Sequence, residues 1–203
     1  DIVPHIEAAE SAPEGTVIYL DEEPDVADFP PEAMILCRTN GPIFGLALQF
    51  LKEQKPCRVM SSYGKDIVKF VKNFKVNTTD ELRDALKVWR DKEIAEAESR
   101  KFWGKINVIH DKYEALLPFC EVFKLKSQVI LALQKLIDGN VGPILSTVHK
   151  AKGLEADDVY ILRPDLLPAP FAKTEAALEQ ERNLKYVAVT RARKNLYFLP
   201  EEL

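Results

Sequence analysis

The segment TVHKAKGLE, from Thr147 to Glu155, places charged and polar side chains between two apolar, β-branched runs. Loops after the carboxyl ends of parallel strands are where open α/β sheets bind ligands. In such a loop, His149 and Lys152 can meet phosphates, and Glu155 can accept a hydrogen bond from a sugar hydroxyl. Gly153 permits a backbone shape that other residues resist. On spacing alone, a solvated charged turn with a satisfied histidine is an equally good interpretation.

A second segment, ERNLKYVAVTRAR, has the apolar spacing of a helix from Glu181 towards Arg193. Arg191 follows Leu184, a member of the apolar stripe, by seven residues. It is therefore expected at the edge of the core, where the helix ends, with its guanidinium aimed outward. That position suits an anion supplied by a neighbour. Taken alone, the pattern favours the simpler interpretation of a cation stabilised by the helix dipole.

A third segment, MILCRTN, runs from Met34 to Asn40 and ends a predicted buried strand. Arg38 and Thr39 come just past the strand, and Asn40 is expected to cap the helix that follows. An arginine at this place can reach a ligand at the edge of the sheet. A surface arginine in a strand-to-helix turn is an equally good interpretation.

A phosphate loop is missing from the sequence. None of the eight glycines belongs to a G-x-x-x-x-G-K-[ST] pattern, and the Gly-Lys steps at Gly64 and Gly104 do not fit it. No acidic pair after a strand resembles a magnesium site. The chain is therefore expected to touch a nucleotide from one side without cradling its phosphates.

The composition is that of an ordinary soluble globular protein, with 46% apolar and 30% charged residues. The net charge is -4, which argues against a nucleic-acid binder that works by bulk charge, so any such contact needs a local patch. The three cysteines lack metal-ligand spacing and are expected to be buried free thiols in a reducing cytosol. No apolar run approaches the roughly 20 residues that span a bilayer. The first residues do not have the pattern of a signal peptide, and we expect the sequence to be cut from something longer.

Strands alternate with helices at both ends of the chain, which predicts a parallel sheet covered on both faces. The middle contains three amphipathic helical patterns and no good strand, and Thr78 with Glu81 forms a capping box at its start. We therefore expect an α/β domain in two parts, residues 1–77 and 141–203, interrupted by a helical insert at 78–140. The charged residues at 90–101 of the insert are most simply a solvated face.

Together, and in this order, the three segments resemble the second RecA-like domain of superfamily 1 helicases of the UvrD/Rep type. MILCRTN resembles the fourth motif of that family, STVHKAKGLEADDVYIL the fifth, and EQERNLKYVAVTRARKNLYFL the sixth. VMSSYGKDIVKFVKNF resembles the segment after the fourth motif in a short-insert, phage-like branch. The resemblance implies a RecA-like three-layer parallel sheet of the P-loop NTPase type, without its own P-loop and with an all-α insert.

The resemblance also implies roles for particular residues. Such motors bind ATP and Mg²⁺ between two RecA-like domains, and the missing N-terminal domain would hold both. Arg191, as the arginine finger, and Arg38 would reach the γ-phosphate, a contact that is worth on the order of 10³-fold or more in rate. Residues implied at the ATP site also include Glu155, on the ribose, and Gly153. Those implied at single-stranded DNA, or at its junction with a duplex, are Thr147, His149 and Lys152, and those that support the motifs are Asn40, Glu181, Arg182, Tyr186 and Thr190.

Two departures from the family leave alternatives open. The phosphate-loop domain is absent, and the inserted domain of longer relatives is reduced to the helices of 78–140, so a contact between the insert and duplex DNA is in doubt. A RecA-like regulatory or protein-interaction module without motor activity, part of a helicase-nuclease, and an RNA motor remain alternatives. The resemblance implies a cytoplasmic protein of a bacterium or its phage that is inactive as this fragment.

Overall fold

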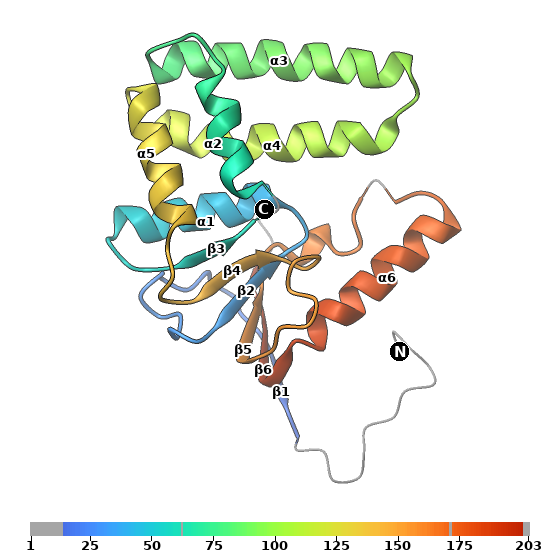
Figure 1. Cartoon of the computed structure of the whole chain (residues 1–203). Helices are drawn as coiled ribbons and strands as arrows, with labels where there is room; N and C mark the ends of the chain where they lie inside the picture. Colours follow the sequence, from blue (N-terminus) through green and yellow to red (C-terminus); the bar gives the residue numbers. More distant parts are fainter. Residues whose placement is uncertain (1–13, 62, 171, 201–203) are drawn as a thin grey trace.

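The computed structural model describes residues 14–61, 63–170 and 172–200. Within them, six strands form one all-parallel sheet in the order β1-β6-β5-β2-β4-β3. The strands are β1 (Thr16–Tyr19), β2 (Met34–Cys37), β3 (Arg58–Met60), β4 (Ile144–Thr147), β5 (Ala156–Ile161) and β6 (Ala192–Phe198). Parallel strands need crossover connections, and most of these are helical here (Figure 1). The predicted α/β fold with a parallel sheet is confirmed.

Helices cover both faces of the sheet, and the central strand β2 shows why. Successive residues of a strand point to opposite faces. Ile35 therefore packs in one apolar cluster with residues of α1 (Asn40–Lys52), while Met34 and Leu36 pack in a second cluster with Ala188 of α6 (Glu175–Val189). All four residues of β2 are buried, as expected for a strand covered on both sides.

The segment predicted as an insert is helical in the structure. The helices beside and within it are α2 (Gly64–Lys72), α3 (Thr79–Ser99), α4 (Trp103–Val122) and α5 (Lys126–Ile137). The predicted capping box is present, since Thr78 accepts from the backbone of Glu81, whose carboxylate accepts from the backbone of Thr78. We keep the name helical insert for residues 78–140, and its status as a separate unit stays a prediction.

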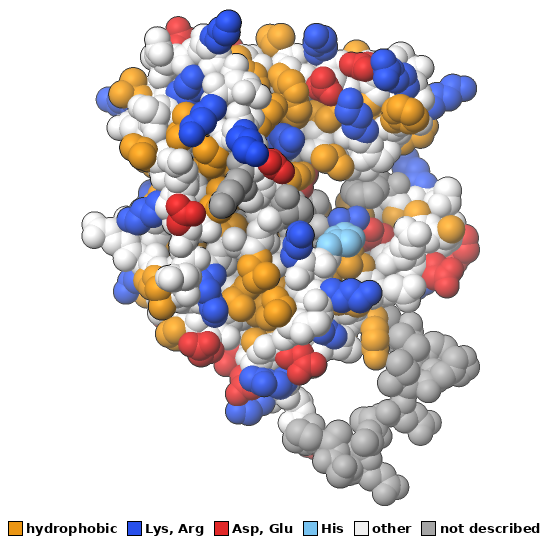
Figure 2. All heavy atoms as spheres, viewed as in Figure 1, with side chains coloured by type: hydrophobic (Ala, Val, Ile, Leu, Met, Phe, Trp, Pro, Cys, Tyr) orange, Lys and Arg blue, Asp and Glu red, His pale blue; other side chains and the backbone are white. Residues whose placement is uncertain are grey.

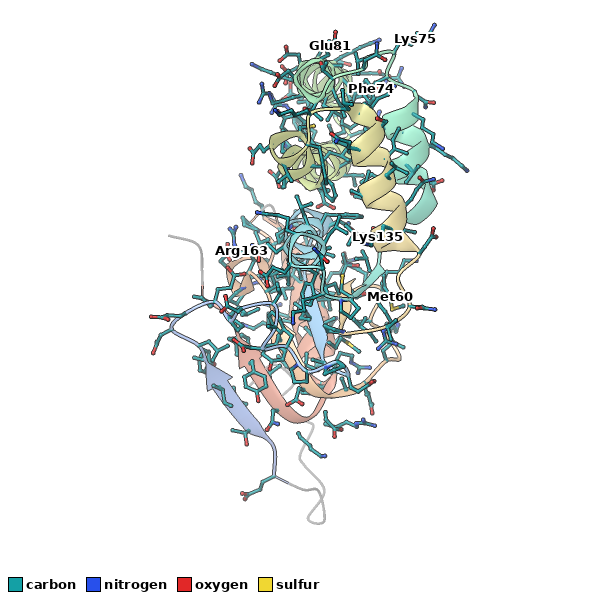
Figure 3. All side chains as sticks on the ribbon, turned by 90° about the vertical axis from the view of Figure 1, so that its left-hand side faces the viewer. Met60, Phe74, Lys75, Glu81, Lys135 and Arg163 are labelled. Carbon is teal, nitrogen blue, oxygen red and sulfur yellow. The ribbon has the colours of Figure 1, made fainter. Side chains whose placement is uncertain are left out.

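The helical insert lies above α1, and α1 lies above the sheet (Figures 1 and 3). In Figure 3 the labelled Glu81 is at the top of the insert and Met60 is at the sheet. The interiors of the two parts are continuous, because Leu116 and Phe119 of α4 belong to the same apolar cluster as Phe44 of α1. Gly41 permits this approach: a Cβ at that position would stand 3.2 Å from the Cβ of Glu114.

The start of α1 differs from the expectation. Asn40 is the first residue of the helix rather than its cap, and Thr39 at the N-cap makes no side-chain capping bond. Asp111 of α4 caps the helix instead: its Oδ1 accepts from the backbone N–H of Asn40 at 2.7 Å and of Gly41 at 2.8 Å. The first N–H groups of a helix lack acceptors within the helix. Here the acceptor is supplied by a residue 71 positions away in the sequence.

All three cysteines are buried and free, as predicted. Burial raises the pKa of Cys37, Cys57 and Cys120 to about 11, so these thiols remain protonated at neutral pH. None of the helices in the described part of the chain is long and apolar enough to cross a membrane.

Replacing Asp111 with alanine should destabilise the chain by about 2 kcal/mol, because it removes a helix cap and charge-assisted hydrogen bonds in one step. The free energy of unfolding from urea titration measures this loss. Asp84→Ala is the matched control, since Asp84 is an exposed carboxylate on α3 and its loss should cost less than about 0.5 kcal/mol. Equal stability of the two variants would contradict the role of Asp111 as the distant cap.

Candidate functional site

A cavity of about 760 Å³ lies where the helical insert faces the carboxyl ends of the central strands. Figure 2 shows the surface recessed between the insert above and the core below, with histidine at the recess. Four parts of the chain line it: the ends of β2 and β4, the residue before α2, the part of α4 from Gly104 to Glu114, and the segment after β5. Its lining includes Arg38, Thr39, Asn40, Tyr63, Asn107, His110, Asp111, Glu114, Thr147, His149, Ala169 and Lys173. We call this space the strand-end cavity.

Arg38 is held in the wall of the strand-end cavity by Glu181 of α6. Its Nε donates to Glu181 Oε2 at 2.9 Å and its Nη2 donates to Oε1 at 2.7 Å, which is a bidentate pair. The backbone N–H of Ala169 donates to the same carboxylate at 3.0 Å. Burial alone would raise the pKa of Glu181, but the hydrogen bonds from Arg38 and Ala169 and the charge of Arg38 lower it. The pair therefore stays ionised and fixes the direction of Arg38.

His149 lies close enough to this pair to feel both charges. Burial, and then the charge of Arg38, lower the pKa of His149, while the charge of Glu181 opposes them. At neutral pH the imidazole is therefore uncharged, and it can donate one hydrogen bond and accept another. Thr147, the last residue of β4, is buried at the floor of the same cavity.

Asn40 is fixed by hydrogen bonds from two directions. Its side-chain N–H donates to Asp111 Oδ2 at 2.8 Å, and its side-chain oxygen Oδ1 accepts from the hydroxyl of Ser61 at 2.9 Å. Tyr63 also donates to Asp111 Oδ2, at 2.8 Å. Burial, and then the nearby charge of Asp111, raise the pKa of Tyr63, so its hydroxyl remains a donor. Asp111 therefore accepts four hydrogen bonds and joins the helical insert to the cavity floor.

Arg191 lies elsewhere, at the junction between α6 and β6. The helix ends at Val189, four residues before the predicted end, and Arg191 leads into the strand. Its guanidinium donates to the carbonyls of Val187 at 2.9 Å and Leu154 at 3.1 Å, and to Thr190 Oγ1 at 3.0 Å. Among the described residues these contacts use three of its five N–H donors, so two remain for an anion.

The TVHKAKGLE segment runs from one end of the sheet to the other. It leaves β4 after Thr147, at the strand-end cavity, and enters β5 at Ala156, whose N–H donates to the carbonyl of Arg191 at 3.0 Å. Gly153, with φ +87°, supplies a left-handed turn that disfavours other residues. Glu155 and Lys152 are exposed, and Glu155 follows the residue whose carbonyl Arg191 contacts.

Arg38 and Arg191 are not brought together. Arg38 lies two residues past Leu36, which is level with Ile161 in the sheet. Arg191 is level with Glu155, the residue before Ala156. Glu155 lies six residues before Ile161. Along the strand direction the two arginines are therefore about eight residues apart, or roughly 25 Å at about 3.3 Å per residue. In this conformation the two guanidinium groups do not reach one phosphate, contrary to the geometry that the motif positions implied.

The predicted supporting residues divide between the two places. Glu181 and Asn40 shape the strand-end cavity. Thr190 and the backbone of Tyr186 brace Arg191, since Thr190 Oγ1 donates to the carbonyl of Tyr186 at 2.9 Å and accepts from Arg191. Arg182 belongs to neither place and pairs with Glu175 on the exposed face of α6 at 2.7 Å.

Sequence reasoning missed Asp111 and Tyr63. Tyr63 lies in the segment that resembles the family after its fourth motif, but it was given no role there, and Asp111 lies within an amphipathic helix where an acidic residue suggests only a solvated face. Its role depends on α4 packing across the start of α1, which no local pattern encodes. The pairing of Arg38 with Glu181, 143 residues later, was missed for the same reason.

No metal site emerges from the described residues, which contain no group of three or more His, Cys, Asp or Glu side chains able to hold an ion. Asp111 in the lining of the strand-end cavity, and Glu181 behind Arg38, are both engaged by hydrogen-bond donors. The two free donors of Arg191 instead suit an anion that is held by another domain.

Several DNA helicases are similar to this chain over part of their length. A "Probable DNA helicase II homolog" from Rickettsia conorii is 29% identical over 117 residues, which are 54% of this chain and 18% of that protein. The "Putative ATP-dependent DNA helicase YjcD" of Bacillus subtilis is 45% identical over 64 residues, 28% of this chain and 8% of that protein. The "F-box DNA helicase protein 1" of Schizosaccharomyces pombe is 29% identical over 113 residues, 53% of this chain and 13% of that protein. The chain thus spans less than a fifth of these relatives.

A family profile described as "UvrD-like helicase C-terminal domain" matches residues 69–201. The match includes the TVHKAKGLE segment and all of α6 and β6, and it therefore includes Arg191. It begins after β3, so it does not include Arg38. It covers more than half of the 203 residues, and the chain therefore belongs to the family of UvrD-like helicase C-terminal domains.

Proposed function

We propose that this chain is the C-terminal motor domain of an ATP-dependent DNA helicase and that the two ends of its sheet serve two ligands. The amino end of β5 and β6, with Arg191, faces ATP, and the strand-end cavity takes single-stranded DNA. The observation that carries this proposal is the separation of the predicted site residues into two groups roughly 25 Å apart along one sheet.

On the nucleotide side, Arg191 acts as the arginine finger. ATP and Mg²⁺ are held mainly by the N-terminal RecA-like domain of a longer protein, because this sequence has no phosphate loop. Three hydrogen bonds orient the guanidinium before ATP arrives, and its two remaining N–H groups stabilise the charge that develops on the γ-phosphate during in-line attack by water. Glu155, beside it, accepts from the ribose. Alone, the chain has no ATPase activity.

On the strand side, Thr147, His149 and Asn40 contact the nucleic acid. We move Arg38 to this side, since its guanidinium lines the strand-end cavity and lies far from Arg191. Glu181 neutralises much of the charge of Arg38 and fixes the direction of its guanidinium, so the pair acts as an oriented group rather than as a bare cation. Contacts of this kind read the backbone and not the base sequence, so RNA is a second candidate ligand. DNA is preferred because the relatives are named DNA helicases.

Two connections link the proposed sites. The TVHKAKGLE segment carries the strand contacts at its start and Glu155 at its end. Glu181 lies in the middle of α6, and Arg191 lies just past the end of this helix. The hydrogen bond from Arg191 to the carbonyl of Leu154 joins the ends of both connections. Closure of this domain over ATP therefore moves the strand contacts, which is the step that a motor needs.

Other parts of the proposal rest on the family alone. These are a cytoplasmic location and an origin in a bacterium, a phage or a prophage. A regulatory module without motor activity is the main rival, and the oriented guanidinium of Arg191 favours the motor.

Arg191→Ala in the parent helicase should lower DNA-stimulated ATP turnover by about 10³-fold while ATP binding stays within a few-fold. The reason is that the finger stabilises charge that exists only in the transition state. Steady-state turnover and equilibrium binding of a fluorescent ATP analogue measure the two quantities.

Arg193→Ala is the matched control for Arg191. Arg193 lies two residues away, is exposed and pairs with Asp157 at the surface, so its loss should leave turnover within about twofold. Normal turnover by the Arg191 variant would support the regulatory module instead.

His149→Ala should weaken binding of single-stranded DNA about five- to tenfold at pH 7.5 without changing the salt dependence, because the lowered pKa leaves the imidazole uncharged. Lys152→Ala provides the comparison. Lys152 is exposed and charged, and the family resemblance implies that it contacts DNA, so its loss should reduce the slope of log affinity against log salt by about one. Fluorescence anisotropy over a salt series measures both. Equal slopes for the two variants would count against the assignment.

A further inference from the structure

The turn between α3 and α4 carries two neighbouring aromatic side chains that face solvent. Phe102 is 58% exposed and Trp103 is 62% exposed. Large aromatic residues bury 150–250 Å² each when they pack in a core, so two adjacent exposed rings call for a ligand or partner. In Figure 1 this turn projects at the end of the long α3–α4 hairpin, over the segment that follows β5. We call residues 99–105 the hairpin tip.

The hairpin tip is positively charged. Its sequence, SRKFWGK, holds Arg100, Lys101 and Lys105 and no acidic residue. Arg100 pairs with Glu96 at 3.0 Å and Lys105 pairs with Glu93 at 2.8 Å, and both pairs are at the surface, where such bonds exchange readily. Lys101 adopts φ +56°, a left-handed conformation that favours glycine, so the tip presents a lysine side chain at a backbone cost.

The hairpin tip also borders the strand-end cavity. Gly104, the residue after Trp103, lines that cavity, as do Asn107 and Val108 on the next turn of α4. A strand that occupies the cavity and continues past Gly104 therefore meets the two rings next. Basic side chains interleaved with exposed aromatic rings are how proteins bind single strands without reading sequence: cations meet phosphates and rings stack on bases.

We propose that the hairpin tip is a second contact for single-stranded nucleic acid, in which Phe102 and Trp103 stack on bases that emerge from the strand-end cavity. This rests on the proposed function of the cavity. It gives the helical insert a direct part in strand binding, which its charged helices did not predict. If the two rings do not contact nucleic acid, the alternative is that another domain of the longer protein covers them.

The test is binding of the parent helicase to a single-stranded oligonucleotide and to an abasic strand of the same length, both by anisotropy. Phe102→Ala/Trp103→Ala should weaken binding to the normal strand about tenfold or more, and the loss should vanish on the abasic strand, which has phosphates but no bases to stack. Phe102→Tyr/Trp103→Tyr keeps both rings and should bind like the wild type. Leu131→Ala is the matched control, since Leu131 is 65% exposed on α5 of the same insert and should have no effect.

Three results would overturn the inference. One is unchanged binding by the double alanine variant, and another is an equal loss on both strands. The third is a lowered unfolding temperature of that variant with normal affinity, which would mean that another domain covers the rings. His149→Ala, measured alongside, separates this inference from the proposed function: if it weakens binding while the tip variant does not, the cavity site stands and the tip contact fails. If both variants bind normally, both proposals fail.

Discussion

The common direction of the six strands is the constraint on which the rest of the structure depends. Because β4 and β5 are parallel, the chain that leaves β4 at the strand-end cavity must travel back along the sheet before it enters β5. Thr147 is level with Cys37, and the register of β5 places Ala156 level with a position six residues before Cys37, ahead of the start of β2, so the return covers roughly 20 Å. Residues 148–155 form this connection as an irregular segment, and its polar residues lie at both ends of the sheet.

The charges around the strand-end cavity determine how it can bind a strand. The chain has a net charge of -4, and the strand-end cavity holds acidic as well as basic groups. Glu181 is tied to Arg38 and Ala169, and Asp111 is tied to four donors, so both carboxylates act as braces for neighbouring groups. The cavity therefore offers oriented hydrogen-bond donors more than bulk positive potential. A site of this kind holds a strand in register and still allows it to move.

The sequence predicted the elements well because their signals are local. The alternation of strand and helix patterns predicted a parallel sheet covered on both faces, and the capping box at Thr78 predicted the start of α3. Motif positions selected Thr147, His149 and Arg191 for two different ligands. What the sequence did not predict depends on long-range packing: Asp111 reaches Asn40 across 71 residues, and Arg38 reaches Glu181 across 143. The separation of Arg38 from Arg191 follows from strand direction and register, which motif order alone does not give.

The most direct test of the two-ended arrangement is a structure of the parent helicase with a non-hydrolysable ATP analogue, Mg²⁺ and an oligonucleotide. The account predicts that Arg191 lies within hydrogen-bond distance of the γ-phosphate. It also predicts that the strand contacts Thr147, His149 and Arg38 at the other end of the sheet. Convergence of Arg38 and Arg191 on one phosphate, or a strand bound away from the strand-end cavity, would contradict it.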